Sequence, residues 1–167
     1  MNGIGTCLWF DGQAEEAAAF YVAIFKNSRI LQTTYYLQEM HRPKGSVLTV
    51  SFMLDGQEFL ALNGGPEFTF SPAISLVIYC ETQAEIDEYW EKLTADGGKE
   101  VECGWLTDKF GVSWQIVPRA MLKMLVDPDT AAAQRAFAAM LKMKKLDIAL
   151  LEQAFAGAQA GGASPAL

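Results

Sequence analysis

Asp11-Gly12-Gln13-Ala14-Glu15 returns seventy positions later as Glu81-Thr82-Gln83-Ala84-Glu85. Each copy follows an apolar run, residues 7–10 in the first case and 77–80 in the second, and leads into a segment with aromatic residues. We therefore expect a strand, a short polar turn and a helix to occur twice in the chain. Internal repetition constrains the architecture more strongly than any single residue does.

The elements around the repeat follow a similar order in both copies. In the first copy we expect a strand at 4–10, a helix at 13–25, a strand at 30–37, and a hairpin of 47–54 with 57–62 around Asp55-Gly56. In the second copy we expect a strand at 73–80, a helix at 83–95, and short strands at 99–103, 105–107 and 112–117. The first copy is about fifteen residues longer between helix and hairpin, which indicates an insertion around a loop at 38–46.

The repeat predicts an α+β fold of two tandem β-α-β-β-β modules followed by a C-terminal helical tail. We place the modules at 1–66 and 67–118 and the helices at 119–160, and we expect 161–167 to be disordered. Methionine and leucine residues form apolar stripes at helical spacing along the tail. Two interpretations of these stripes stay open: packing of the helices on the sheet, and a dimer interface.

Composition argues against several classes of function. The chain has 167 residues, a net charge of -7 and a pI near 4.7, so we expect no basic surface for nucleic acid. It has neither the run of ~20 apolar residues that spans a bilayer nor a basic and apolar leader, so we expect no membrane partner and no secretory signal. Its three cysteines are widely spaced and odd in number, which favours reduced thiols in a cytoplasmic protein.

Four stretches carry a resemblance to a known family: Leu8–Ala17, Leu62–Phe68, Cys103–Gln115 and Met140–Asp147. On these stretches the chain resembles the glyoxalase/bleomycin-resistance/dioxygenase superfamily, also called vicinal oxygen chelate. Within it the chain resembles the PhnB-like subgroup, also labelled demethylubiquinone methyltransferase-like. The resemblance implies the two-module fold over nearly the whole chain. It implies much less about activity, because one fold carries many chemistries.

The resemblance also implies where a metal would lie. Relatives with known chemistry hold a divalent metal with His and Glu from the first and last strands of the modules. The corresponding positions in this chain are Gly5, Leu60, Ser75 and Gln115. A register shift of one residue would place Ile4 and Ile74 there instead of the glycine and the serine. Transition metals prefer imidazole, thiolate or carboxylate ligands, and the only histidine, His41, falls in the 38–46 loop, so we expect no metal.

Six residues are candidates to line a small-molecule pocket in the cup formed by the sheet: Cys7, Trp9, Ser75, Tyr79, Ser113 and Gln115. They lie on strands at the parity that should face the cup. Each also has a purely structural interpretation, with Cys7 as a small packing residue and Ser113 and Gln115 as satisfied buried polar groups. Alternation sends Trp114 and Cys80 to the opposite face, where we expect core packing.

Two further ligand classes are disfavoured. Asn63-Gly64-Gly65-Pro66 opens no helix and lacks the Lys and Ser/Thr of a phosphate loop, so we interpret it as a turn. S-adenosylmethionine enzymes of the common class need a doubly wound parallel sheet with a glycine-rich first loop. The expected order of strands and helices does not provide such a sheet, and we expect no cofactor.

Three hypotheses for the function follow from these observations. The first is a metal-independent protein that binds a small molecule in the cup and forms a homodimer. The second is an enzyme, either the methyltransferase that the subgroup label names or a metal-dependent lyase or dioxygenase with unusual ligands. The third is a structural role through dimerisation, with an occluded cup. The lack of a His and Glu set favours the first hypothesis over the second.

Overall fold

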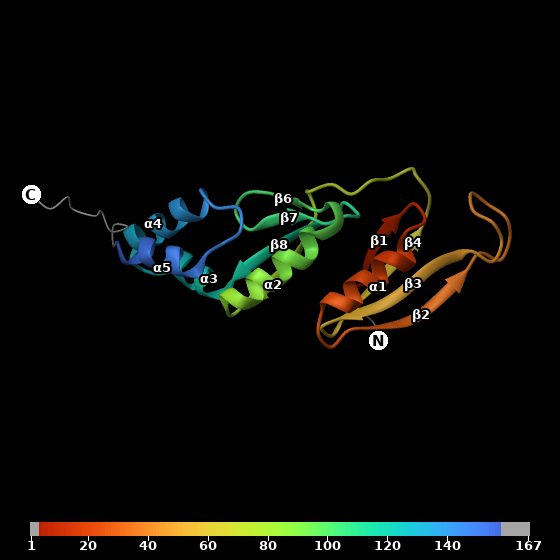
Figure 1. Ribbon diagram of the computed structural model, residues 1–167, viewed down its shortest axis with the longest axis horizontal. Coiled ribbons are helices and arrows are strands. Elements are labelled where there is room, and N and C mark those ends of the chain that lie inside the picture. Colours follow the sequence, from red (N-terminus) through yellow and green to blue (C-terminus); the bar gives the residue numbers. More distant parts are fainter. Residues whose placement is uncertain (1–3, 158–167) are drawn as a thin grey trace, which may run out of the picture. The chain divides into compact units, whose positions relative to one another are not determined.

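Two compact units make up the chain in the computed structural model, which describes residues 4–157. The first unit is Met1–Phe70 and the second is Ser71–Leu167. Each unit contains a four-stranded sheet and a helix in the β-α-β-β-β order, and the second also contains the C-terminal helices (Figure 1). The α+β fold of two such modules with a helical tail is therefore confirmed.

The first unit forms a mixed sheet with one parallel pair of strands. Its elements are β1 (Thr6–Phe10), α1 (Ala14–Ile24), β2 (Arg29–Tyr35), β3 (Val47–Leu54) and β4 (Gln57–Asn63). The strand order is β1-β4-β3-β2, with β1 parallel to β4 and the other neighbours antiparallel. Asp55 and Gly56 turn the hairpin with φ of 44° and 85°, the two positive values that a type I′ turn requires.

The second unit repeats this arrangement. Its elements are β5 (Leu76–Cys80), α2 (Gln83–Thr94), the short 3-10 helix η1 (Ala95–Gly97), β6 (Lys99–Glu100), β7 (Trp105–Thr107) and β8 (Ser113–Pro118). The strand order is β5-β8-β7-β6, and β5 runs parallel to β8. The predicted strand at 99–103 is shorter than expected, because Cys103 and Gly104 have φ of 61° and 81°, values that no strand adopts.

The strand register confirms the alignment of the two copies. Cys7 pairs with Leu60 in the first unit, and Val77 pairs with Gln115 in the second. The first pairing spans fifteen residues more than the second, which is the length expected for the insertion between helix and hairpin.

Each helix covers one face of its own sheet. In the first unit the fully buried Tyr21 stacks on Phe52, with ring centroids 6.2 Å apart, and Phe52 stacks on Phe59 at 5.6 Å. In the second unit Trp114 and Cys80 are 2% and 1% exposed, as the alternation predicts. The opposite face of each sheet therefore carries the residues that were expected to face a cup.

The two helices begin in different ways, although their turns share the repeated pattern. In α2 the Thr82 hydroxyl accepts from the Glu85 N–H and the Glu85 carboxylate accepts from the Thr82 N–H, which is a complete capping box. In α1 the residue before the helix, Gln13, makes no capping side-chain hydrogen bond. The Ala14 N–H donates instead to Asn63 Oδ1 at the end of β4, over 2.9 Å.

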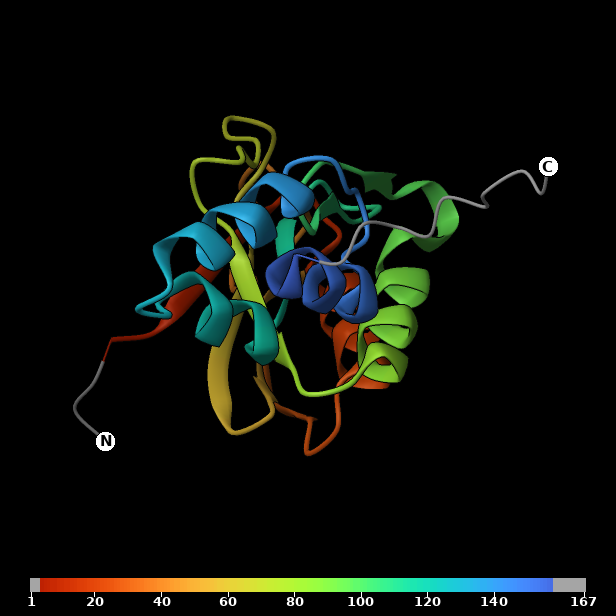
Figure 2. The same cartoon turned by 90° about the vertical axis from the view of Figure 1, so that its left-hand side faces the viewer.

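The tail forms three short helices that pack together in the second unit (Figure 2). They are α3 (Arg119–Leu125), α4 (Thr130–Met140) and α5 (Ile148–Ala156). Asp129 and Asp147 cap the starts of the last two, and Gly157 ends α5 with φ of 79°. Their shared core consists of Val117, Met121, Leu146 and Leu151. Residues 161–167, which we expected to be disordered, lie outside the described part of the chain.

Polar contacts attach the tail to the module of its own unit. Gln83 at the start of α2 donates to the Leu146 carbonyl at 3.1 Å and accepts from the Ile148 N–H at 2.9 Å. The N–H groups of Cys103 and Gly104 donate to the Met143 and Lys144 carbonyls, each at 2.7 Å. No helix among residues 4–157 is long and apolar enough to span a bilayer.

Candidate ligand-binding site

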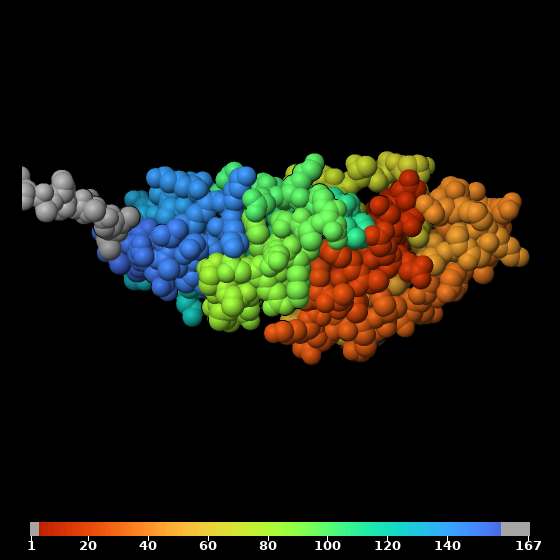
Figure 3. Space-filling model, in the orientation of Figure 1, coloured from red at the N-terminus to blue at the C-terminus, as the bar shows by residue number. Residues whose placement is uncertain are grey.

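A cavity of about 730 Å³ lies in the first unit, where the loop from β2 to β3 adjoins the open face of the sheet. Its apolar lining comes from Trp9, Leu37, Met40, Leu48 and Leu62. Thr34, Tyr36 and His41 add a few polar atoms. The loop belongs to the surface region drawn in orange in Figure 3. An apolar cavity with few polar groups is the usual form of a small-molecule site, and we refer to this cavity as the loop pocket.

Trp9 forms the wall of the loop pocket on β1. Its Nε1 donates to the Gly65 carbonyl at 2.8 Å, and its ring meets Phe68 edge to face with centroids 5.0 Å apart. A Cβ on Gly64 would lie 2.2 Å from the Trp9 ring, so only glycine permits this approach. The protein itself therefore fixes the orientation of the indole.

The turn after β4 uses its N–H groups within the protein. The N–H groups of Gly64 and Gly65 donate to the Phe10 carbonyl at 3.0 and 3.4 Å. They are therefore not free to cradle a phosphate, and the interpretation of this segment as a turn is supported.

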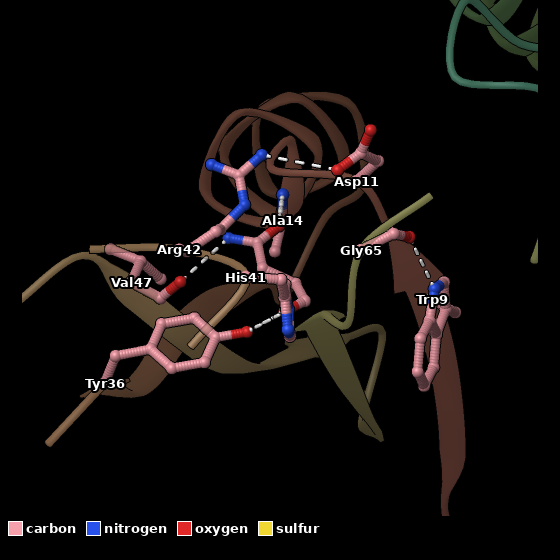
Figure 4. Close-up of polar contacts among 9 residues, drawn as sticks. Trp9, Asp11, Ala14, Tyr36, His41, Arg42, Val47 and Gly65 are labelled. Atoms are coloured by element: carbon pink, nitrogen blue, oxygen red, sulfur yellow. Dashed lines mark hydrogen bonds and ion pairs between the residues drawn. The ribbon is translucent and has the colours of Figure 1, made fainter. Parts of the chain in front are cut away.

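A hydrogen-bonded chain links the loop to the end of β4. The Tyr36 hydroxyl donates to the Asn63 carbonyl oxygen at 2.5 Å and lies 2.6 Å from His41 Nε2 (Figure 4). Tyr36 is 4% exposed, whereas His41 is exposed. The Asn63 side chain accepts from the Ala14 N–H and donates to the Val47 carbonyl at 3.0 Å. These two bonds hold Asn63 in place, and with it the carbonyl that accepts from Tyr36.

The loop is closed at its base and fastened near its tip. At the base, the Tyr36 N–H donates to Ser46 O and the Gly45 N–H donates to Tyr36 O, each at 2.9 Å. Near the tip, the Arg42 guanidinium lies against Gly12, where any Cβ would collide with it. Arg42 Nη2 is 3.5 Å from the Asp11 carboxylate (Figure 4).

A smaller cavity of about 480 Å³ lies elsewhere in the first unit. Its lining includes Gly5, Cys7, Met53, Glu58 and Leu60. Gly5 and Leu60 are the first-unit positions at which relatives would hold a metal, and neither side chain offers a ligand atom. Desolvation raises the pKa of the Cys7 thiol above its ordinary value, which disfavours the nucleophilic thiolate.

The second unit brings two of the predicted residues together. Gln115 Nε2 donates to Ser75 Oγ at 2.8 Å. Tyr79, half-exposed on the same face of the sheet, has the Arg119 guanidinium 5.0 Å from its ring centroid. Ser113 is 5% exposed, which agrees with its interpretation as a buried polar group.

The predicted site residues thus fall into three local environments. Trp9 lines the loop pocket, Cys7 lines the smaller cavity, Tyr79, Ser113 and Gln115 lie on the second sheet, and Ser75 directly precedes its strand β5. The sequence places His41 in the loop at 38–46 and Tyr36 in the strand expected at 30–37, which ends in the structure at Tyr35. One signal in the sequence could have pointed to His41: it is the only histidine of the chain, and it closely follows Tyr35 and Tyr36.

The chain matches the family described as 3-demethylubiquinone-9 3-methyltransferase over residues 2–117. The chain belongs to this family. The expected PhnB-like identity is confirmed by a solved PhnB protein that is 39% identical to this chain. A comparison with curated proteins found no match.

Solved structures include relatives of this family member. A PhnB protein from Bacillus cereus is 39% identical, with a TM-score of 0.64 over 70% of this chain and 99% of that chain. The PA1353 protein from Pseudomonas aeruginosa is 18% identical, with a TM-score of 0.57 over 71% and 98% of the two chains. The fosfomycin resistance protein FosX from Listeria monocytogenes, solved with Mn(II) and sulfate, is 16% identical, with a TM-score of 0.51 over 70% and 91%. At these low identities, the last two structures show only that the fold is shared.

The cofactor that the family name suggests does not fit this family member. A methyltransferase of the common class holds S-adenosylmethionine at the edge of a doubly wound parallel sheet. Each sheet described in residues 4–157 has a single parallel pair. A metal does not fit either, because no group of three or more His, Cys, Asp or Glu side chains in this part of the chain could hold one.

Proposed function

We propose that this family member binds a small, largely apolar molecule in the loop pocket and does so without a metal or cofactor. The observation that carries the proposal is the pocket itself: apolar side chains from the sheet and the loop surround a few polar atoms that the protein has already oriented. We further propose that the protein works in the cytoplasm as a homodimer.

Two leucines on one strand provide a matched test. Leu62 and Leu60 lie on the same face of β4 and are both half-buried, but only Leu62 lines the loop pocket. The probe is 2-methoxynaphthalene, a neutral ring of suitable size, and its affinity is measured by isothermal titration. Leu62→Gln should weaken binding roughly tenfold, because it places an amide against the apolar ring. Leu60→Gln should leave the affinity within twofold.

Two results would count against this site. If the probe does not bind to the wild type, the loop pocket is not a site for apolar rings. If Leu60→Gln weakens binding as much as Leu62→Gln does, the ring lies elsewhere. Circular dichroism and thermal unfolding of both variants verify that they fold.

Metal independence has its own test. Elemental analysis of protein purified without an affinity tag or added metal should find less than a tenth of an equivalent of Zn, Ni, Mn or Fe, and EDTA should not alter probe affinity. One equivalent of any of these metals would contradict the proposal.

Methyl transfer is the second candidate, and the family match over residues 2–117 favours it. Its test is release of S-adenosylhomocysteine when the protein is incubated with S-adenosylmethionine and a phenolic acceptor. Release above a heat-denatured control would support this candidate over simple binding.

The dimer proposal rests on apolar side chains that the tail leaves exposed. Val126 is 81% exposed, and Phe137, Leu141 and Leu150 are each about half-exposed. Sedimentation equilibrium should give twice the chain mass of 18.3 kDa. A mass equal to the single chain at 50 μM protein would contradict the homodimer.

A further inference from the structure

The Tyr36 hydroxyl determines which nitrogen of His41 carries a proton. The Asn63 carbonyl can only accept a hydrogen bond, so the Tyr36 hydroxyl donates its single proton to that carbonyl, over 2.5 Å. The remaining contact of that hydroxyl, 2.6 Å to His41 Nε2, then requires Nε2 to be the donor. The distance of 3.5 Å from Nε2 to Asn63 O agrees with a proton on Nε2.

Nδ1 of His41 is consequently left as an acceptor. A neutral imidazole has one N–H, and Nε2 holds it, so Nδ1 has a lone pair. Within residues 4–157, the hydrogen bonds of the His41 ring are all made through Nε2.

The turn after β4 determines which edge of the ring stays open. A Cβ built on Gly65 would meet His41 Cδ2 at 3.2 Å, with Nε2 and Cγ as the next atoms. The Cδ2 edge therefore lies against the turn, and the opposite edge of the ring carries Nδ1. The Nδ1 edge thus points away from the turn, on a residue that is exposed and lines the loop pocket.

We infer that the loop pocket selects an apolar ring compound bearing a hydroxyl group, whose O–H donates to His41 Nδ1. This inference rests on the proposed binding function and specifies its ligand class. Tyr36 acts as a positioning residue, because it fixes the tautomer of His41. Other polar side chains also line the pocket, among them Thr34 and Gln38, and the Thr34 hydroxyl already shares a 2.6 Å hydrogen bond with Thr49.

The test compares two probes that differ only in the donor. 2-Naphthol donates a hydrogen bond and 2-methoxynaphthalene does not; both affinities are measured at pH 8 on the full chain without a tag. The wild type should prefer 2-naphthol by about fivefold, the worth of one hydrogen bond. His41→Phe should remove this preference, so that the two probes bind with equal affinity, and circular dichroism verifies that the variant folds. Thr34→Val should retain the preference.

The tautomer has a direct readout, because His41 is the only histidine of the chain. A long-range proton–nitrogen NMR spectrum should show one imidazole with its proton on Nε2. Tyr36→Phe should give a mixture of both tautomers and a reduced preference for 2-naphthol.

Several outcomes would overturn the inference. Equal binding of the two probes by the wild type, an unchanged preference in His41→Phe, or a proton on Nδ1 would each do so while leaving the binding function in place. Failure of both probes to bind would instead remove the binding function on which the inference rests.

Discussion

Gln115 on β8 donates a hydrogen bond of 2.8 Å from Nε2 to the hydroxyl of Ser75, which directly precedes the parallel neighbour strand β5. These are the two second-unit positions at which relatives would place metal ligands. In this chain they satisfy each other, with an amide donor and a hydroxyl acceptor. An amide and a hydroxyl are poor ligands for transition metals, which prefer imidazole, thiolate or carboxylate.

Removal of this hydroxyl should lower stability. Ser75→Ala leaves the partly buried Gln115 amide without its acceptor, and we expect the free energy of unfolding to fall by about 1 kcal/mol. Urea denaturation of the variant and the wild type measures this loss of unfolding free energy. Adding Gln115→Leu to Ser75→Ala should cost less than the two single changes summed, and strict additivity would show that the pair is not coupled.

The glycine beside Trp9 should not tolerate a side chain. Gly64→Ala forces a Cβ into the indole, so we expect a loss of about 1–3 kcal/mol and a changed Trp fluorescence spectrum. Gly5→Ala is the matched control, because nothing lies within 4 Å of the Cβ that it adds. Equal effects of the two substitutions in urea denaturation would show that the clash is relieved without cost.

The repeat supplies its own control for the attachment of the tail. Gln83→Ala removes the bonds to Leu146 and Ile148, and we expect a loss of about 1–3 kcal/mol, with faster amide hydrogen exchange in α5. Gln13→Ala alters the equivalent residue of the first copy, which makes no capping bond, and should change stability by less than about 0.5 kcal/mol. Unchanged exchange in α5 of Gln83→Ala would contradict the attachment.

Acid should weaken the contact between α2 and the tail. Hydrogen bonds from Lys145 first and Gln83 second lower the pKa of Asp87 below the ordinary aspartate value. Because the pKa is lowered, the ionised Asp87 carboxylate contributes to the free energy of unfolding above pH 3.8, the ordinary pKa, and this contribution is lost as pH falls through the lowered pKa. The contribution is small because the carboxylate is exposed. Carboxyl NMR should show the Asp87 pKa rising in Lys145→Ala but staying unchanged in Lys144→Ala.

The cysteines should differ in reactivity. Burial, and to a lesser degree the charge of Glu85, raises the pKa of Cys80 to about 12, so this thiol stays protonated at pH 8. Iodoacetamide should label Cys80 only after unfolding in urea, as mapped by mass spectrometry. The exposed Cys7 should be labelled in the folded protein, though more slowly than a free thiol because its pKa is also raised. Labelling of Cys80 as fast as Cys7 would contradict this order.

The sequence predicted those parts of the fold that depend on local periodicity. The two helices and the hairpin at Asp55-Gly56 follow from alternation and turn signals, and the equivalence of Leu60 with Gln115 follows from the repeat. The strand expected at 99–103 ends instead at Glu100, and the positive φ at Cys103, a non-glycine residue, has no strong sequence signal.

The candidate site was less predictable, because it depends on contacts between distant residues. Trp9 was identified by strand parity, but the contact of Tyr36 with Asn63 spans 27 residues and no local pattern indicates it. The role of Asn63 in capping α1 spans 49 residues. Without these contacts, His41 could be read only as part of an insertion.

The attachment of the tail through Gln83 also bears on the order of events during synthesis. A ribosome synthesises α2 and the strands of its sheet before it reaches Leu146 and Ile148. Gln83, which binds these two residues, is therefore present before the tail emerges. The capping box of Thr82 and Glu85 secures the helix start without using Gln83, so the bonds from Gln83 to Leu146 and Ile148 can form when the final helices arrive. A nascent chain can thus fold its second module first and add the last three helices as a closing step.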